Sequence, residues 1–232
     1  ALLAMDTATS AISVALVRPG AEPVSRSVID PRGHTEHLAP LIASVLREAG
    51  VAPGELTDLA VGTGPGPFTG LRVGLVTART MGFALGIPVH GVCSLDVLAR
   101  MAALRFDGEL LVATDARRKE VYWARYAAAG GHARRISEPA VERPAHLPEE
   151  VRALPTAGRG PLLFPDLFPS STDGVVDVDA AVLATLALEQ LADGLELPVE
   201  ALYLRRPDAQ PVSERKSTIV PPPAMRGRGR AR

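Results

Sequence analysis

The sequence predicts an α/β protein of two related lobes, each a mixed sheet flanked by helices, with the second lobe eroded. Short apolar segments alternate with amphipathic helices in the order β-β-β-α-β-α-β over the first half of the chain. In addition, LAMD at 3–6 returns as VATD at 112–115, and a further apolar strand follows at the same offset, from Ile12 and from Val121. A strand, an aspartate turn and a second strand also form a common hairpin, so coincidence stays open as an explanation of the repeat.

Apolar periodicity places the elements of the first half. The expected strands are 2–5, 11–17, 24–29, 58–62 and 87–92, and the expected helices are 35–49 and 70–85. Six apolar residues form the inner stripe of the first helix: Leu38, Leu41, Ile42, Val45, Leu46 and Ala49. Pro40 lies either in its first turn or at a kink.

The stretch 62–88, GTGPGPFTGLRVGLVTARTMGFALGIP, is the most informative in the chain, because it contains a strand end, a glycine-rich elbow and a complete helix. Thr69 is the expected N-cap, and Gly86 is the expected C-terminal stop. The helix is apolar on nearly every side. Its second apolar face is therefore expected to meet something other than the protein's own core.

The second half is less regular. Residues 128–174 are rich in proline, glycine and charge, and only 179–193 forms a firm helical pattern. We therefore divide the chain into a first lobe at 1–98 that carries the partner-docking helices, a second lobe at 99–206, and a flexible basic, proline-rich tail at 207–232. The tail is expected to lack a dedicated ligand, with nonspecific RNA contact as the alternative.

Composition excludes few functions. The chain has 232 residues, 47% of them hydrophobic, and a formal net charge of -1, which argues against neither nucleic acid nor acidic partners. A single cysteine, Cys93, excludes an internal disulfide. No apolar run approaches the roughly 20 residues that span a bilayer, and the first residues do not resemble a signal peptide. We expect a cytoplasmic protein without membrane contact.

The first aspartate turn is of the kind that actin-like and hexokinase-like ATPases use at their phosphates. Here both turns lack glycine, and the elbow has no Walker A lysine. We therefore expect no tightly bound cofactor, with ATP held only weakly or in an assembled complex. The residues of a vestigial nucleotide contact would be Asp6, Thr7, Thr9, Gly64 and Gly66.

Several segments together resemble the TsaB family, the noncatalytic partner in bacterial threonylcarbamoyladenosine modification of tRNA. They are LAMDTATSAISVALV, HTEHLAPLI, GTGPGPFTGLRVG, GVCSLD, ATDARRKEVYWARY and ALYLRRPDA. The resemblance implies an actin-like, ribonuclease H-like fold. It also implies a scaffold that binds the catalytic subunit TsaD as a heterodimer, together with TsaE, for transfer to the adenosine beside the anticodon. tRNA would be met through the complex, and the free chain would be a homodimer.

In the related TsaD, the strand after the elbow helix leads into a His-x-x-x-His metal motif. Ser94 and Leu98 stand at those positions here, and neither replaces imidazole, so we expect no metal site and no catalytic residue. His34 and His37 could share a helix face, but without a visible third ligand a polar helix entry is the preferred interpretation. The enzyme alternatives are a metallopeptidase of the glycoprotease family and a small-molecule kinase of the hexokinase type.

The helices 70–85 and 35–49 are the expected docking surface for TsaD. Gly70 and Gly74 lie one turn apart and would form a smooth groove, with Thr77 and Met81 on the same side. The full predicted set is His34, His37, Leu41, Gly70, Arg72, Val73, Gly74, Thr77 and Met81. Arg72 and Arg79 would either anchor a partner's carboxylate or form a solvated edge.

The second hairpin has a basic tip, Arg117-Arg118-Lys119. Such a tip is usually only a solvated turn, and RNA contact is the alternative. An aromatic content of 4% gives little sign of a base-stacking platform.

Overall fold

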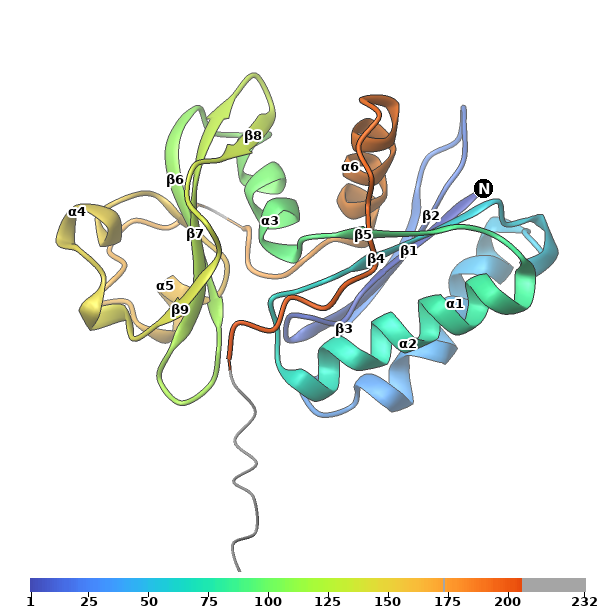
Figure 1. Ribbon diagram of the computed structural model, residues 1–232, viewed down its shortest axis with the longest axis horizontal. Coiled ribbons are helices and arrows are strands. Elements are labelled where there is room, and N and C mark those ends of the chain that lie inside the picture. The colour runs from blue at the N-terminus through green and yellow to red at the C-terminus, as the bar shows by residue number, and fades with distance from the viewer. Residues whose placement is uncertain (173, 206–232) are drawn as a thin grey trace, which may run out of the picture.

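The computed structural model describes residues 1–172 and 174–205, and the chain forms five layers across them (Figure 1). Two helices cover the outer face of a first sheet, two further helices lie between the sheets, and short helices cover the outer face of the second sheet. The predicted tail, 207–232, lies outside the described residues. This arrangement confirms the predicted α/β fold of two mixed sheets with flanking helices.

The first sheet has the strand order β3-β2-β1-β4-β5. Its strands are β1 (Leu2–Asp6), β2 (Ala11–Val17), β3 (Val24–Ile29), β4 (Asp58–Gly62) and β5 (Val89–Val92). β1 pairs antiparallel with β2 and parallel with β4, so the sheet is mixed. Alternation along β1 sends Leu3 and Met5 toward the outer helices, and Leu2 and Ala4 toward the inner ones.

The second sheet repeats this plan, which supports a real internal repeat. Its order is β10-β6-β7-β8, with β9 also paired to β7. The strands are β6 (Gly108–Asp115), β7 (Val121–Ala129), β8 (His132–Arg135), β9 (Ala140–Glu142) and β10 (Thr156–Ala157). β6 is antiparallel to β7 and parallel to β10, just as β1 is to β2 and β4.

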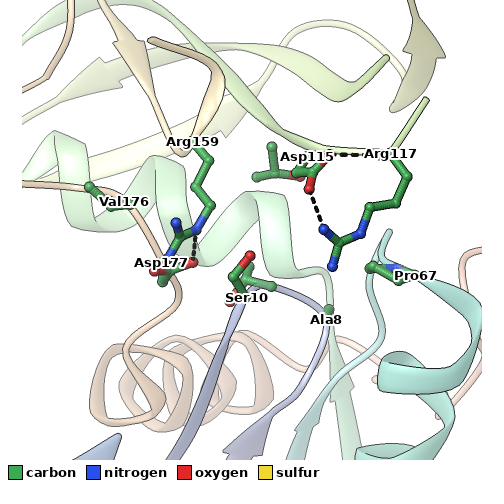
Figure 2. A pocket seen from close by; sticks show the side chains of 10 residues that line it. Ala8, Ser10, Pro67, Asp115, Arg117, Arg159, Val176 and Asp177 are labelled. Atoms are coloured by element: carbon green, nitrogen blue, oxygen red, sulfur yellow. Dashed lines mark hydrogen bonds and ion pairs between the residues drawn. The ribbon is translucent and has the colours of Figure 1, made fainter. Parts of the chain in front are cut away.

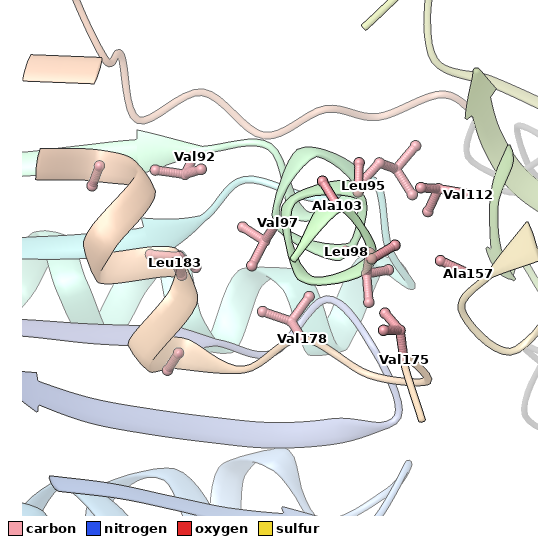
Figure 3. Packing of buried hydrophobic residues seen from close by; sticks show 14 of the residues in the cluster. Val92, Leu95, Val97, Leu98, Ala103, Val112, Ala157, Val175, Val178 and Leu183 are labelled. Atoms are coloured by element: carbon pink, nitrogen blue, oxygen red, sulfur yellow. The ribbon is translucent and has the colours of Figure 1, made fainter. Parts of the chain in front are cut away.

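The helices complete the layers. They are α1 (His34–Ala49), α2 (Phe68–Leu85), α3 (Ser94–Ala103), α4 (Glu149–Arg152), α5 (Gly160–Leu163) and α6 (Ala180–Ala192). α1 and α2 pack on the outer face of the first sheet, whereas α3 and α6 form the central layer. Figure 3 shows this central layer. Val97 of α3 lies toward Leu183 of α6, whereas Leu95 and Leu98 of α3 lie toward Val112 of β6.

The predicted border at residue 98 does not separate the lobes in space. It falls inside α3, which packs on β6, β7 and β8 of the second sheet. α6, predicted for the second lobe, packs on β1 and β2 of the first. Residues 197–202 also return to the first sheet, where Leu197 O accepts from Gly91 N and Thr63 O accepts from Leu202 N. The amphipathic pattern tells which residues are buried but not which sheet buries them.

Most predicted elements of the first half are confirmed within one or two residues, and Gly86 is the left-handed C-cap of α2. The predicted N-cap is wrong, because α2 begins at Phe68, before Thr69, and has Pro67 at the N-cap position. Pro40 lies inside α1 rather than in its first turn. Among the described residues, no helix is both long and apolar enough to cross a membrane.

Candidate functional site

Asp6, the aspartate of the predicted vestigial nucleotide contact, is fully buried inside the protein. Ser94 Oγ donates a hydrogen bond of 2.6 Å to Asp6 Oδ2, and Ala8 N donates one of 2.9 Å to Asp6 Oδ1. Complete burial raises the pKa of Asp6 above its usual value, although these hydrogen bonds act in the opposite direction. Both carboxylate oxygens are thus occupied by groups of the same chain.

The elbow glycine Gly62 allows this close contact. A Cβ there would overlap Asp6 Oδ2 and lie 2.8 Å from Ser94 Oγ. The elbow is also tied to α3, because Ser94 N donates to Gly64 O at 2.8 Å. Gly66 is buried against the β1–β2 turn, and its carbonyl accepts a hydrogen bond of 3.3 Å from Tyr122 OH of the other lobe. The elbow glycines therefore serve tight packing inside this chain.

The Thr7 hydroxyl binds two backbone groups of α2. Thr7 Oγ1 donates to Gly70 O at 2.7 Å and accepts from Gly74 N at 3.0 Å. These two groups are the acceptor and the donor of an ordinary i to i−4 helical bond, so the hydroxyl ties the β1–β2 turn to the backbone of α2. A Cβ on Gly74 would lie 2.5 Å from Thr7 Oγ1.

This geometry corrects the predicted partner groove. Gly70 and Gly74 face the β1–β2 turn and are buried, so they form no outward surface. Glycine has no side chain whose polarity would reveal the direction it faces. The sequence pattern therefore could not show whether these two glycines face the core or the solvent.

His34 and His37 do not share a common surface of α1. His34 is buried, with Nε2 3.3 Å from Thr9 O, and His37 Nε2 lies 3.2 Å from Asp30 Oδ2. His34 therefore lies under the turn and not on the predicted docking surface. No group of three or more histidine, cysteine or acidic side chains is placed to hold a metal within 1–172 and 174–205.

The two residues at the metal positions of the related motif have structural roles here. Ser94 binds Asp6, and Leu98 is fully buried in the central core. Neither is a metal ligand by its chemistry or by its surroundings.

The space between the two aspartate turns is almost closed. Figure 2 shows Ala8, Ser10 and Pro67 on one side, and Asp115 and Arg117 on the other. The cavity between them measures about 10 Å³, near the minimum for a single water molecule. A second ion pair lines it, since Arg159 Nε donates to Asp177 Oδ1 at 2.8 Å. Of the predicted nucleotide residues, Thr9 lines this space, which is too small for a nucleotide, and Gly66 lines a separate and larger cavity beside it.

The β6–β7 turn has an unusual backbone. Arg117, Arg118 and Lys119 have φ of 62°, 52° and 62°, in the left-handed region that favours glycine. Each such residue costs roughly 1–2 kcal/mol. The turn is closed by Ala116 N donating to Glu120 O at 3.0 Å and by Arg117 N donating to Asp115 Oδ1 at 2.7 Å.

The outer face of α2 exposes apolar side chains, with the exposed Arg72 and Arg79 beside them. Phe83 is 91% exposed and Val76 is 60% exposed, one heptad apart on the side away from the sheet. Thr69 and Thr80 are exposed on the same face, and Val73, Thr77 and Met81 are half-buried beside it. On α1, Leu41 and His37 are half-buried. Val76 and Phe83 were missing from the predicted set, although their seven-residue spacing on an all-apolar helix was the signal that could have found them.

A family model and a curated relative identify the family of this chain. The family model described as TsaD, tRNA N6-adenosine threonylcarbamoyltransferase, matches residues 28–170. The Escherichia coli tRNA threonylcarbamoyladenosine biosynthesis protein TsaB is 34% identical, over 88% of this chain and 94% of that protein. The chain belongs to the TsaB family. It therefore also lies within the larger group that the TsaD model describes.

Further relatives and a solved structure extend the match. An uncharacterized Mycobacterium tuberculosis protein, Rv3421c, is 42% identical over 91% of this chain and 95% of its own length. The uncharacterized Mycobacterium leprae protein ML0378 is 40% identical over 94% of this chain, and the chain spans only 58% of that protein. The solved structure of YeaZ from Pseudomonas aeruginosa has a TM-score of 0.76 at 32% identity, over 88% of this chain and 99% of that one. Together with the Escherichia coli relative, the YeaZ match confirms the TsaB-family resemblance and the α/β fold of two mixed sheets.

Proposed function

We propose that this TsaB-family chain is a noncatalytic scaffold subunit in the biosynthesis of threonylcarbamoyladenosine in tRNA. The name of the Escherichia coli relative supports the pathway. The observation that carries the noncatalytic role is the sealed Asp6, whose oxygens bind Ser94 and Ala8 of the same chain. Because Asp6 is also fully buried, its carboxyl group has no exposed surface at which to hold a metal-bound water.

The proposed partner is a TsaD-family threonylcarbamoyltransferase of the same organism, bound through the outer face of α2 together with α1. The support is the exposed pair Val76 and Phe83, because isolated surface hydrophobics are ordinary but an apolar stripe along one helix is typical of a docking face. Half-buried Leu41, Val73, Thr77 and Met81 would form its floor. The free chain would use the same face for a homodimer, and the two assemblies would compete.

In this proposal the transfer chemistry belongs to TsaD, with TsaE as a further subunit and tRNA met through the complex, in the cytoplasm. The chain itself would hold no resident metal. ATP would enter the space between the aspartate turns only if the lobes separated, because the present cavity of about 10 Å³ has no room for it.

Co-purification with the host's TsaD-family protein tests the docking face. Val76→Asp and Phe83→Asp should each weaken binding more than a hundredfold, because an unpaired charge in a desolvated interface costs about 3 kcal/mol or more. Leu162→Asp is the matched control, since Leu162 is also exposed, at 64%, but lies on α5 over the second sheet. Unchanged TsaD binding by both α2 variants would move the interface elsewhere.

Reconstituted tRNA modification tests the role itself. Modification of tRNA should require the wild-type chain, and the wild-type chain without TsaD and TsaE should catalyse no step of the reaction. Peptidase activity with about one equivalent of tightly bound metal would favour the metallopeptidase alternative. Sugar-dependent ATP turnover by the isolated chain would favour the kinase alternative.

A further inference from the structure

A cavity of about 900 Å³ lies beside the N-terminal end of α2, just outside the closed space between the aspartate turns. It shares Pro67 and Arg117 with that closed space. Three segments that are distant in sequence form its wall: residues 66–72, the β6–β7 turn with Tyr122, and residues 203–205. Figure 1 shows the last segment running down between the two lobes toward this turn.

One wall of the cavity is an aromatic and guanidinium stack. The ring centroids of Phe68 and Tyr203 are 5.4 Å apart. The guanidinium carbon of Arg72 lies 3.7 Å from the centroid of Phe68, and Arg72 Nε donates to Tyr203 OH at 2.9 Å. Both rings remain about half exposed. Aromatic faces and guanidinium planes are the surfaces on which unpaired bases stack, so the wall is a preformed stacking platform.

The remaining wall is cationic. Four arginines and no carboxylate line the cavity: Arg72, Arg117, Arg118 and Arg205. Arg117 is paired with Asp115, and Arg205 with Glu120 and with Ala116 O. Arg72 has ring and hydroxyl partners but no ion pair with a described carboxylate. The N-terminal end of α2 adds its positive dipole. Guanidinium groups and a helix N-terminus together favour phosphate.

We propose that this cavity binds nucleotides of single-stranded RNA, with a base stacked on the Phe68–Tyr203 wall and a phosphate held by Arg72 and the arginines of the β6–β7 turn. The arginines come from three segments that are distant in sequence and are spread around the cavity, which favours a strand over a free nucleotide. The inference rests on the proposed function, since tRNA supplies the strand. A free nucleotide offers the same base and phosphate and is the second arm of the test.

The test is a fluorescence anisotropy titration of the full chain against a labelled anticodon stem-loop RNA at several salt concentrations. Arg72→Gln and Tyr203→Leu should each weaken binding about tenfold, the size typical of one lost stacking or phosphate contact. Arg72→Gln should also make the salt dependence shallower by about 0.7 in the log–log slope, whereas Tyr203→Leu should leave it unchanged.

Arg79→Gln is the matched control. Arg79 is exposed on the same helix, donates to Val199 O, and lies outside the cavity, so its substitution removes the same charge. Its affinity should stay within twofold of wild type. An equal loss from Arg72→Gln and Arg79→Gln would overturn the site in favour of diffuse electrostatics, and unchanged binding in both cavity variants would overturn it outright.

ATP and AMP titrations complete the test. Binding of ATP with the same sensitivity to Arg72→Gln and Tyr203→Leu, but no RNA binding, would overturn the strand and assign the cavity to a free nucleotide. Thermal midpoints check that each variant folds, and Phe68→Leu replaces Tyr203→Leu if the latter unfolds. Wild-type co-purification with TsaD is scored separately, so a failed RNA titration with intact TsaD binding removes only this inference.

Discussion

The β1–β2 and β6–β7 turns begin with the same chemistry and end in opposite environments. In each, the first aspartate Oδ1 accepts the backbone N–H two residues on, Ala8 for Asp6 and Arg117 for Asp115. The second oxygen of Asp6 binds the buried Ser94 hydroxyl, whereas that of Asp115 binds the exposed Arg117 guanidinium. The repeat thus preserves the local turn, and what covers the turn decides its role.

Size and charge explain the divergence. The first turn, Thr7-Ala8-Thr9-Ser10, has only small side chains and fits beneath α2. The second carries Arg117, Arg118 and Lys119, which stay exposed and accept a strained backbone. One turn has become part of the core, and the other has become part of a cationic surface.

Gly62→Ala should have the largest effect on the buried turn. The added methyl group overlaps Asp6 Oδ2, where neither strand can yield easily, and we expect a loss of about 3 kcal/mol in the free energy of unfolding. Gly54→Ala is the control, because a Cβ at Gly54 meets nothing within 4 Å. Urea unfolding measures both variants. A Gly62→Ala protein as stable as the Gly54→Ala protein would mean that the turn is looser than described.

Thr7→Val should have a smaller effect, about 1 kcal/mol. It keeps the shape of the side chain but removes the hydroxyl between Gly70 O and Gly74 N. The loss is limited because Gly74 N and Gly70 O can bond each other directly within the helix. Hydrogen exchange at the Gly74 amide gives the local readout, and unchanged protection there would show that the Thr7 hydroxyl does not stabilise that amide.

Asp6→Asn tests the raised pKa of the buried carboxyl. Because the folded pKa of Asp6 lies above the unfolded value, its contribution to stability is fully present below the unfolded pKa of about 3.8 and is lost as pH rises through the folded pKa. Asparagine does not titrate. The stability of the variant relative to wild type should therefore increase with pH across this window and then level off. A difference independent of pH would show that Asp6 titrates normally.

Lys119→Gly should give the smallest effect and the opposite sign. Glycine relieves the left-handed strain but loses more chain entropy on folding, so a net gain of about 0.5 kcal/mol is expected. Gly130 already occupies a left-handed position, in the neighbouring β7–β8 turn, and Gly130→Ala should lower stability by a comparable amount. Thermal unfolding compares the two, and a loss in Lys119→Gly would mean that the side chain compensates for the strain.

The sequence predicted the first sheet and its outer helices well, because period-2 and period-3.6 patterns are local. It also predicted the repeated hairpin from a short motif. It did not predict that α6 crosses to the first sheet, since helix patterns carry no information about their partner sheet. Nor did it predict the meeting of Phe68 with Tyr203, because two residues so far apart in sequence share no periodicity. The aromatic content of 4% argued against a stacking platform, but two rings are enough to form one when the fold brings them together.

The exchange of α3 and α6 between the sheets constrains the order in which the chain acquires its structure during synthesis. The inner face of the first sheet, with Ala4, Ala15 and Ala60, is covered by α6, which ends only at Ala192. The amino-terminal lobe therefore emerges from the ribosome with one face bare, and it keeps that face bare until nearly all the described chain has been made. A chain of this topology is a poor candidate for splitting into two independently folding fragments. The core of the first sheet is complete only after α6 has been synthesised.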